Sequence, residues 1–366
     1  MTPDLGFYVP ALRGGKAFVP NDPGKIEGFK GLITEVEKCS SALARLDTLI
    51  IRLPDPYLLT ENLIFMEAVT SSRIEGTKAR FEDLFSTMPL SNAEDVLEVK
   101  NCADAFRLGE EILSQSTSVT AVAQELHKIL MKGHPTVVGG ELKKSQNYTI
   151  KQDGSIFAYT PPNYLEQALS MFENFTMKED ELPELIRQAI SHWIFEQIHP
   201  FPDGNGRVGR LLIPLILKHK GYIDTPFALI SEFVEKQKND YIRQFEQLHE
   251  TGDWIPWCRF FLSVTHLNAD KNITRITNLE TLRLDYQERI SDKSKNSVLH
   301  KIVQDLFARP RFTRKELTAI YGVSPRGASL VVQELIDRHI IRPVEKEFSQ
   351  RNVLFEAHEI LKTVVE

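Results

Sequence analysis

The chain has 366 residues, of which 42% are hydrophobic and 26% are charged, an ordinary composition for a globular protein. This length predicts two or three domains rather than one core. The formal net charge of −6 provides no overall attraction to nucleic acid or to an anionic membrane surface.

Targeting signals and cysteine usage both favour a protein of the cytoplasm. No apolar run approaches the length that spans a membrane, and the first residues lack the charged and apolar regions of a signal peptide. Cys39, Cys102 and Cys258 are odd in number and far apart, which suits neither a disulfide framework nor a zinc site. We therefore expect buried thiols in a reducing compartment, and no membrane partner.

The N-terminal part of the chain predicts an irregular arm followed by two helices. Residues 1–23 are rich in Pro and Gly and are expected to be irregular. Apolar residues recur at helical spacing over residues 25–51, and the prolines that follow end this helix. A second helix is expected over residues 58–75, with Gly76 at the C-cap.

Glu75 lies in an unfavourable place, at the C-terminal end of that second helix. A helix C-terminus carries partial negative charge, so a carboxylate there costs a few tenths of a kcal/mol, up to about 1. Two explanations stay open at this point. Glu75 either has a cationic partner elsewhere in the fold or is a solvated glutamate that tolerates the cost.

The pattern then changes from helical to β-like and back. Helices are expected over residues 93–113 and 119–131. Residues 147–151 and 155–159 read as two strands around the turn signal Gln152-Asp153-Gly154. This predicts one hairpin in an otherwise helical chain, which serves either as a plain connection or as an edge that pairs with an extended peptide.

Apolar spacing predicts further helices after the hairpin. Asn163 and Glu166 resemble a capping box for the first of them. A polar segment, residues 291–297, is the best linker in the chain. The expected helices cover residues 164–175, 185–197, 232–249, 255–268 and 269–290.

The C-terminal residues resemble a winged helix-turn-helix. Thr313 and Ser324 are the expected N-caps of its second and third helices, and Pro325 fits the first turn of the third. The expected elements are helices over residues 298–307, 314–321 and 325–338 and strands over 340–344 and 352–355. The whole chain is therefore divided into predicted domains at residues 1–90, 91–290 and 297–366.

The charge of this C-terminal region gives little support to DNA binding. Residues 297–366 carry a net charge of only about +2, and Arg326 is the sole basic residue early in the expected recognition helix. A packing, dimerisation or partner-docking module is favoured over a DNA-binding one.

The stretch from His199 to Arg210 concentrates the unusual residues of the chain. Gly204, Asn205 and Gly206 lie where a loop is expected to enter a helix, so their unpaired N–H groups and the helix dipole favour an anion. Arg207 and Arg210 share a face of that helix and can contact further phosphate oxygens.

Two more side chains complete a nucleotide site. Asp203 would repel a phosphate unless a divalent cation lay between them, and Mg²⁺ commonly binds one carboxylate together with substrate phosphates. His199 is the one side chain of the stretch that accepts a proton near neutral pH. A Walker A motif and a calcium loop are both excluded by the spacing, and simple helix capping does not explain two arginines ahead of an apolar helix.

Residues His199–Arg210 resemble the His-x-Phe-x-Asp/Glu-Gly-Asn-Gly-Arg-x-x-Arg signature of Fic-family proteins, with every signature position matched. Ser71-x-x-x-Glu75-Gly76 is similar to the inhibitory motif of that family, and the hairpin lies where the family has its target-docking flap. The whole chain is similar to the SoFic type. The resemblance implies a mainly α fold: a Fic-type helical core with one β-hairpin flap, plus a C-terminal winged helix-turn-helix domain.

The resemblance also implies a reaction. His199 would deprotonate a hydroxyl of a target protein, which then attacks the α-phosphate of ATP, so that AMP is transferred and pyrophosphate leaves. Asp203 would hold Mg²⁺ on the α- and β-phosphates, and Arg207 would hold the β-phosphate. The N–H groups of Gly204, Asn205 and Gly206 would form the anion hole.

Regulation is implied by the same resemblance. Arg210 would take the γ-phosphate in the active state and pair with Glu75 in the resting state, with Ser71 and Gly76 completing the inhibitory motif. Tyr241 falls near a family tyrosine that flanks the adenosine, although a second tyrosine of that pattern is Ile242 here. The nucleotide-binding positions are then Glu75, Asp203, Gly204, Asn205, Gly206, Arg207, Val208, Gly209, Arg210 and Tyr241.

The expected function is thus a self-inhibited protein adenylyltransferase that acts on Ser, Thr or Tyr hydroxyls of target proteins and of itself. Its partners would be the target protein and, since proteins of this type often self-associate, a second copy in a homodimer. The alternatives are removal of AMP or transfer of another nucleotide at the same site, and a nucleotide-sensing DNA-binding regulator.

Overall fold

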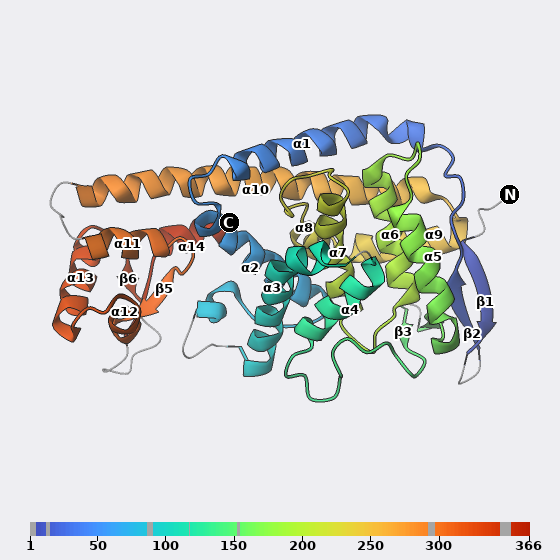
Figure 1. Ribbon diagram of the computed structural model, residues 1–366, viewed down its shortest axis with the longest axis horizontal. Coiled ribbons are helices and arrows are strands. Elements are labelled where there is room, and N and C mark those ends of the chain that lie inside the picture. The colour runs from blue at the N-terminus through green and yellow to red at the C-terminus, as the bar shows by residue number, and fades with distance from the viewer. Residues whose placement is uncertain are drawn as a thin grey trace. The chain divides into compact units, whose positions relative to one another are not determined.

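The computed structural model describes residues 5–11, 15–85, 91–116, 118–151, 154–291, 297–344 and 353–366 (Figure 1). Within these ranges the chain is mostly helical, as the sequence predicts, and it forms fourteen α-helices. It divides into two compact units. Unit 1 holds Met1–Thr48, Thr70–Gly76 and Asn101–Asp270, and unit 2 holds Leu49–Val69, Thr77–Lys100 and Lys271–Glu366.

Unit 1 is built around two buried helices. Helix α6 (Glu184–Ile198) is buried from Leu185 onward and packs against α5 and α7. Helix α7 (Asn205–His219) is buried from its first residue to Leu217. Ala189, Trp193 and Ile194 of α6 are fully buried. The helices around this pair are α1 (Ile33–Ile51), the end of α2 (Pro56–Ile74), most of α3 (Ala93–Ser114), α4 (Val119–Leu130), α5 (Leu165–Met177), α8 (Ser231–Lys236), α9 (Lys238–Thr251) and the start of α10 (Trp254–Ser291).

The prediction of an irregular N-terminal arm is wrong. Residues Gly6–Pro10 and Lys16–Pro20 form strands β1 and β2 of a four-stranded sheet, in the order β1-β2-β4-β3. The expected hairpin is present as β3 (Tyr148–Ile150) and β4 (Ile156–Ala158), whereas Gln152 and Asp153 of its turn lie outside the described residues. Figure 1 shows β1 and β2 at the same end of the unit as β3, and β4 lies between β2 and β3 in the sheet, although more than a hundred residues separate the two pairs of strands in sequence.

A small apolar cluster explains why the N-terminal strands form. Val9, Ala17 and Val19 pack with Ala158 of β4, and β2 pairs in parallel with β4 at Ala17. The Thr160 hydroxyl, just beyond β4, donates to the carbonyl of Phe18 at 3.1 Å. The hairpin is therefore part of a larger sheet, because an isolated two-stranded hairpin is only marginally stable.

Three helix predictions need correction. The expected helix 232–249 is interrupted at Gln237 and forms α8 and α9. The two expected helices 255–268 and 269–290 are one helix, α10, because buried Asn268 donates to the carbonyls of Ile230 and Val264 and does not end it. The capping box predicted at Asn163 and Glu166 is absent here: residues 162–164 form a 3₁₀ turn, and α5 begins without a side-chain cap.

Unit 2 ends in a helical region with a small antiparallel sheet. Thr313 and Glu316 form a capping box on α12, and the Ser324 hydroxyl caps α13, both as predicted. The sheet has the order β5-β7-β6, and Glu356 of β7 pairs with Arg311 and Arg342 on either side. The elements are α11 (Ser297–Asp305), β5 (Arg311–Thr313), α12 (Arg314–Tyr321), α13 (Pro325–Asp337), β6 (Arg342–Pro343), β7 (Leu354–Glu356) and α14 (His358–Val365).

Several sequence predictions stay open after this description. Strand β5 and helix α14 were not expected, and the winged helix-turn-helix assignment stays a prediction. The predicted domain boundaries also stay predictions, and residues 86–90, 292–296 and 345–352, which include the expected linker and the turn between the last two strands, lie outside the described residues. All three cysteines are buried thiols, as expected. Over the described part of the chain, no helix combines the length and apolar character needed to cross a bilayer.

Candidate functional site

The site begins at the loop that joins α6 to α7. His199 caps the C-terminus of α6 in the left-handed conformation, with φ 50° and ψ 59°. Gly204 caps the N-terminus of α7 with φ 74°. Asn205 closes the loop between them, because its Oδ1 accepts from the Phe201 N–H at 2.8 Å and its Nδ2 donates to the Phe201 carbonyl at 2.9 Å.

His127 of α4 supports this loop, a role that the sequence did not reveal. Its Nδ1 accepts from the N–H of Gly140 at 2.9 Å, so its Nε2 carries the proton that is donated to the Asp203 carbonyl at 3.2 Å. The ring stacks on Phe201 at a centroid distance of 4.0 Å. Burial lowers the pKa of His127 to about 4, which keeps the ring neutral and both hydrogen bonds in place.

The first turn of α7 has the features that the sequence analysis expects of an anion site. The N–H groups of its first residues have no acceptor one turn earlier, and the helix dipole adds positive potential there. Arg207 and Arg210 are both buried, each with 3% of its surface exposed. A buried pair of guanidinium groups at a helix N-terminus favours a multiply charged anion such as a triphosphate.

Asp203 is the one carboxylate of the signature, and it is half exposed. Its Oδ1 accepts from the N–H of Gly204 at 2.6 Å and lies 3.9 Å from Nη2 of Arg207. The described residues contain no cluster of three or more His, Cys, Asp or Glu side chains that could hold a metal. A single oxygen ligand on the rim suits Mg²⁺, which takes its remaining ligands from phosphates and water.

Glu75, at the end of α2, lies against this same helix turn. Its Oε1 accepts from Nη2 of Arg210 at 2.7 Å, and a side chain at Gly206 would overlap with that oxygen. Ser71, one turn earlier on α2, accepts from Nε of Arg210 with its hydroxyl and from Nη2 with its carbonyl, both at 2.9 Å. Of the two explanations for Glu75, the structure supports the cationic partner.

The charges of this pair reinforce one another. Burial alone would raise the pKa of Glu75, but Arg210, Arg207 and His199 hold it below its usual value. Burial likewise works against the charge on Arg210, whereas the attraction of Glu75 raises its pKa. The Glu75 side chain still has 37% of its surface exposed, so this carboxylate lies at the edge of the site.

The end of α2 is also held by one contact with α9 and one with α8. Gly76 follows Glu75 with φ 108°, a conformation that favours glycine. The Nζ of Lys238, at the start of α9, donates to the Ile74 carbonyl, and Arg73 lies 3.8 Å from Glu235 of α8. A lysine at a helix C-terminus satisfies a carbonyl that has no partner within the helix.

His199 has the protonation state of a general base. Its Nδ1 donates to the Glu196 carbonyl at 3.2 Å, and because a carbonyl only accepts, Nε2 keeps its lone pair. The ring stacks on Tyr159 at 3.9 Å. Burial, together with the charge of Lys143, lowers the pKa of His199 to about 4, although Glu75 and Asp203 act in the opposite direction. The imidazole is therefore neutral at pH 7.

An aromatic cavity of about 260 Å³ is lined by Tyr159, whose ring stacks on His199. Tyr241 of α9 lines it, and the Tyr241 hydroxyl lies 2.8 Å from Nε2 of His192. Glu196 contributes a carboxyl group whose pKa burial raises to about 8. Flat aromatic walls with a few polar groups suit a planar ring such as a nucleobase.

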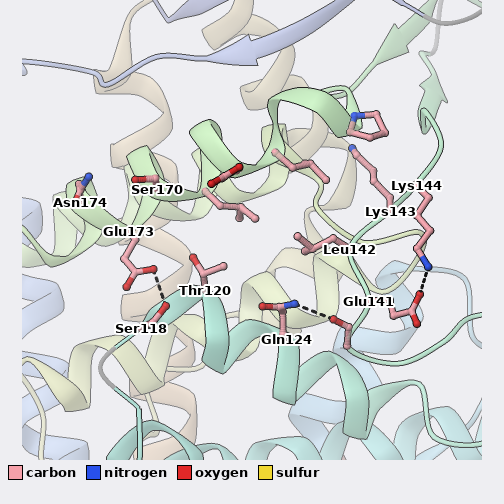
Figure 2. A pocket seen from close by; sticks show the side chains of 15 residues that line it. Ser118, Thr120, Gln124, Glu141, Leu142, Lys143, Lys144, Ser170, Glu173 and Asn174 are labelled. Carbon is pink, nitrogen blue, oxygen red and sulfur yellow. Dashed lines mark hydrogen bonds and ion pairs between the residues drawn. The ribbon is translucent and has the colours of Figure 1, made fainter.

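A wider groove of about 980 Å³ lies between α4, α5 and the segment that leads to the hairpin (Figure 2). Ser118 donates to Glu173 across it at 2.8 Å, and Gln124 donates to the Gly140 carbonyl at 3.1 Å. Lys143 and Lys144 lie at one end. None of the residues predicted from the sequence to act in catalysis or binding lines this groove.

Comparison with known proteins gives a consistent picture. Residues 118–217 match the Fic/DOC family, and residues 33–111 match the Fic/DOC family N-terminal region. A protein named protein adenylyltransferase Fic, from Drosophila grimshawi, is 27% identical over 231 residues, which are 56% of this chain and 45% of that protein. The chain thus spans less than half the length of the curated relatives it matches.

Solved structures agree on the fold. A Fic family protein from Desulfovibrio desulfuricans superposes with a TM-score of 0.59 at 19% identity, over 92% of this chain and 98% of that one. A Fic domain containing signaling protein from Bacteroides thetaiotaomicron gives a TM-score of 0.53 at 16% identity, over 66% and 97% of the two chains. At these identities the likeness shows the fold alone.

Proposed function

We propose that this chain, which belongs to the Fic/DOC family, is a protein adenylyltransferase that moves AMP from ATP to Ser, Thr or Tyr hydroxyls of a target protein and of itself. One observation carries the proposal: a neutral histidine with a free Nε2 lies beside a helix N-terminus that holds two buried arginines. The names of the curated relatives point to the same activity.

His199 carries out the proton transfer in this proposal. Its Nε2 takes the proton of the target hydroxyl, and the oxygen attacks the α-phosphorus of ATP. The bond from that phosphorus to the bridging oxygen of the β-phosphate breaks, so that AMP stays on the target and pyrophosphate leaves. The neutral tautomer, fixed by the Glu196 carbonyl, keeps Nε2 ready for this step.

The anion site of α7 would bind the triphosphate. The N–H groups from Gly204 to Gly206 stabilise the negative charge on the α-phosphate oxygens, Arg207 holds the β-phosphate and Arg210 the γ-phosphate. Asp203 would hold Mg²⁺, which neutralises phosphate charge when bound. The aromatic cavity beside Tyr159 would take the adenosine, with Tyr241 in its wall.

Glu75 would inhibit the resting enzyme by occupying the place of a phosphate. Its carboxylate satisfies Arg210 and lies over Gly206, so a γ-phosphate and Glu75 compete for the same guanidinium. The contact is charge-assisted and worth about 1.5–3 kcal/mol, which corresponds to roughly 10- to 100-fold in occupancy.

Strand β3 would bind the segment that carries the target hydroxyl. It lies at the edge of the four-stranded sheet, and Tyr148, Ile150 and Ile156 of the hairpin are exposed. An edge strand offers main-chain hydrogen bonds to an extended peptide. Because Tyr159 follows β4 and stacks on His199, such a peptide would lie close to the base.

The test is the Glu75→Gly variant incubated with ATP labelled on the α-phosphate. We expect self-modification to rise about 10- to 100-fold, and His199→Ala in the same background to remove it. Glu179→Gly, in the exposed loop after α5, is the matched control and should behave as the wild type. If no variant becomes labelled, the proposed transferase activity is contradicted. If label is instead lost from a target that already carries AMP, the activity is removal of AMP.

A further inference from the structure

A buried lysine joins the segment just before the hairpin to the loop between α6 and α7, which carries His199. Lys143 has 3% of its surface exposed. Its Nζ donates to the Ile198 carbonyl at 3.1 Å and to Oδ1 of Asn147 at 2.6 Å. Its backbone N–H donates to the Pro200 carbonyl at 2.9 Å. One residue thus contacts the loop on both sides of His199.

Asn147 completes the arrangement. Its Nδ2 donates to the Phe201 carbonyl at 3.1 Å and, more weakly, to the His199 carbonyl at 3.4 Å. The four consecutive carbonyls from Ile198 to Phe201 therefore each accept a hydrogen bond from Lys143 or Asn147. Lys143 fixes the orientation of the Asn147 amide by donating to its oxygen, so the two side chains act together.

This loop needs such support because of the backbone of His199. Among the described residues, only His199 and His339 are non-glycine residues with positive φ. A left-handed conformation costs a non-glycine residue of order 1–3 kcal/mol and persists where surrounding contacts hold it. With a proline on its C-terminal side, His199 lies in a loop whose direction depends on where its carbonyls are bonded.

Burying the ammonium group of Lys143 costs free energy, and its hydrogen bonds to the loop offset that cost. Burial of an ammonium group opposes its charge and lowers the pKa of Lys143 to about 7. The oxygens that it contacts belong to a carbonyl and an amide, which fix direction rather than neutralise charge. An apolar side chain would fill the same space without aligning the carbonyls.

We propose that Lys143 and Asn147 are positioning residues that hold His199 in its left-handed conformation and tie the start of the hairpin to the base. The proposal rests on the proposed function. Asn147 immediately precedes β3, so the same hydrogen bonds set both the base and the strand that would carry the target. Neither residue contacts Arg207, Arg210 or the first turn of α7 in the hydrogen bonds described above.

The experiment compares Lys143→Met with Lys144→Met, both in the Glu75→Gly background. Lys144 is the matched control, since its side chain is 83% exposed and pairs with Glu141, and Figure 2 shows the two lysines leaving the chain in opposite directions. We expect Lys143→Met to lower kcat about 100-fold, because a displacement of about 1 Å at a reacting group costs that much. The KM for ATP should change less than about twofold, and Lys144→Met should change neither constant.

A second readout does not depend on activity. The titration of the His199 ring, followed by NMR, should move to higher pH in Lys143→Met, because the ammonium no longer opposes the imidazolium. The other charged groups that face the ring are Glu75, absent from this background, and Asp203, which is unchanged. Asn147→Ala, which leaves Lys143 in place, should lower kcat without that upward shift.

The outcomes separate the two proposals. If Glu75→Gly itself transfers no AMP, the proposed function fails, and the backbone chemical shifts of His199, which report its left-handed conformation, still decide the role of Lys143: unchanged shifts in Lys143→Met would overturn it. A kcat of Lys143→Met within about twofold of its parent, with an unmoved titration, would overturn the positioning role. Weakening of ATP binding in step with kcat would overturn it as well. Should Lys143→Met not fold, Asn147→Ala decides by its kcat and KM for ATP alone.

Discussion

The α6–α7 loop together with the first turns of α7 forms one region of the site, and the end of α2 forms another. The two regions meet at Arg210 of α7, yet they are built in different ways. The loop is enclosed: its carbonyls are bonded in sequence, Asn205 closes it, and both flanking helices are buried along nearly their whole length. The end of α2 reaches the site with a carboxylate that is 37% exposed.

The difference follows from the proposed function: the base and the anion site must stay fixed, whereas the Glu75 carboxylate must leave before ATP binds productively. A base and an anion site work by pre-organisation, so their supports are buried and numerous. A blocking group works only if it can be displaced, and Glu75 lies at a helix end with a partly exposed carboxylate on Arg210, although Ser71 also accepts from that guanidinium. Substitutions on the two sides of Arg210 should therefore have different consequences.

The largest effect is expected at Gly206, where the two regions touch. A Cβ there would overlap with the present position of Glu75 Oε1 and lie 2.9 Å from Nη1 of Arg210. In the Glu75→Gly background, Gly206→Ala should weaken ATP binding and transfer about 100-fold, since a phosphate oxygen meets the same obstacle. Calorimetry with ATP measures the loss, and unchanged affinity would show that the triphosphate lies elsewhere.

Gly209→Ala should instead destabilise the fold. Its Cβ would overlap with Oε1 of Glu196 and lie 3.1 Å from the ring of Phe195, both inside the contact between α6 and α7. Overpacking of this kind costs about 1–3 kcal/mol. The midpoint of denaturant unfolding should fall for Gly209→Ala and hold for Gly206→Ala; the reverse order would refute the distinction between the two regions.

Ser71→Ala should have a smaller effect, in the opposite direction. It removes the hydroxyl that accepts from Nε of Arg210 but leaves the Ser71 carbonyl and Glu75 in place. The loss of about 1 kcal/mol from the resting contact should raise self-modification roughly fivefold above wild type. Thr176→Val, which alters a buried hydroxyl that donates to Ser191, is the control, and an equal rise in both would point to general loosening.

The smallest change is expected with pH. In the protein without substrate, the pKa of His199 is lowered to about 4 from an ordinary 6.5. The neutral imidazole, which can accept a proton, therefore persists above pH 4 and is lost as the pH falls through that value. Lys143 loses its proton near pH 7, where His199 is already neutral. The kcat/KM of Glu75→Gly should stay within about twofold from pH 5.5 to 8. A fall of kcat/KM below about pH 6.5 would mean that another group is the base.

The features that the sequence predicted are those with local causes. The caps at Thr313 and Ser324 depend on residues within one helical turn. The anion site depends on glycines and arginines that are neighbours on one helix. Glu75 is the informative case, because its place at a helix end left a cationic partner and a solvated carboxylate both open, and only the contact with Arg210 distinguishes them.

The features that the sequence did not predict depend on contacts between distant segments. Strand β2 pairs with its neighbour β1 over five positions, and the two strands pack on β4, about 140 residues later, through one paired position and a small apolar cluster. The Pro and Gly of residues 1–23 predicted only an irregular arm, because that distant partner has no local signal. The sequence predicted a helix end at Asn268, but its amide donates to the carbonyls of Ile230 and Val264 and the helix continues. Lys143 and His127 carry no sequence signal for their hydrogen bonds to a loop more than fifty residues away.

The pairing of β2 with β4 also bears on where this protein can be cut. The family matches begin at residue 33, yet Phe18 of β2 lies with its ring 4.4 Å from that of His249 and 6.1 Å from that of Trp193. A fragment trimmed to the matched residues would lose the strands that pack on β4, and Phe157 of β4 lines the aromatic cavity. The smallest active piece is thus expected to be larger than the region that identifies the family.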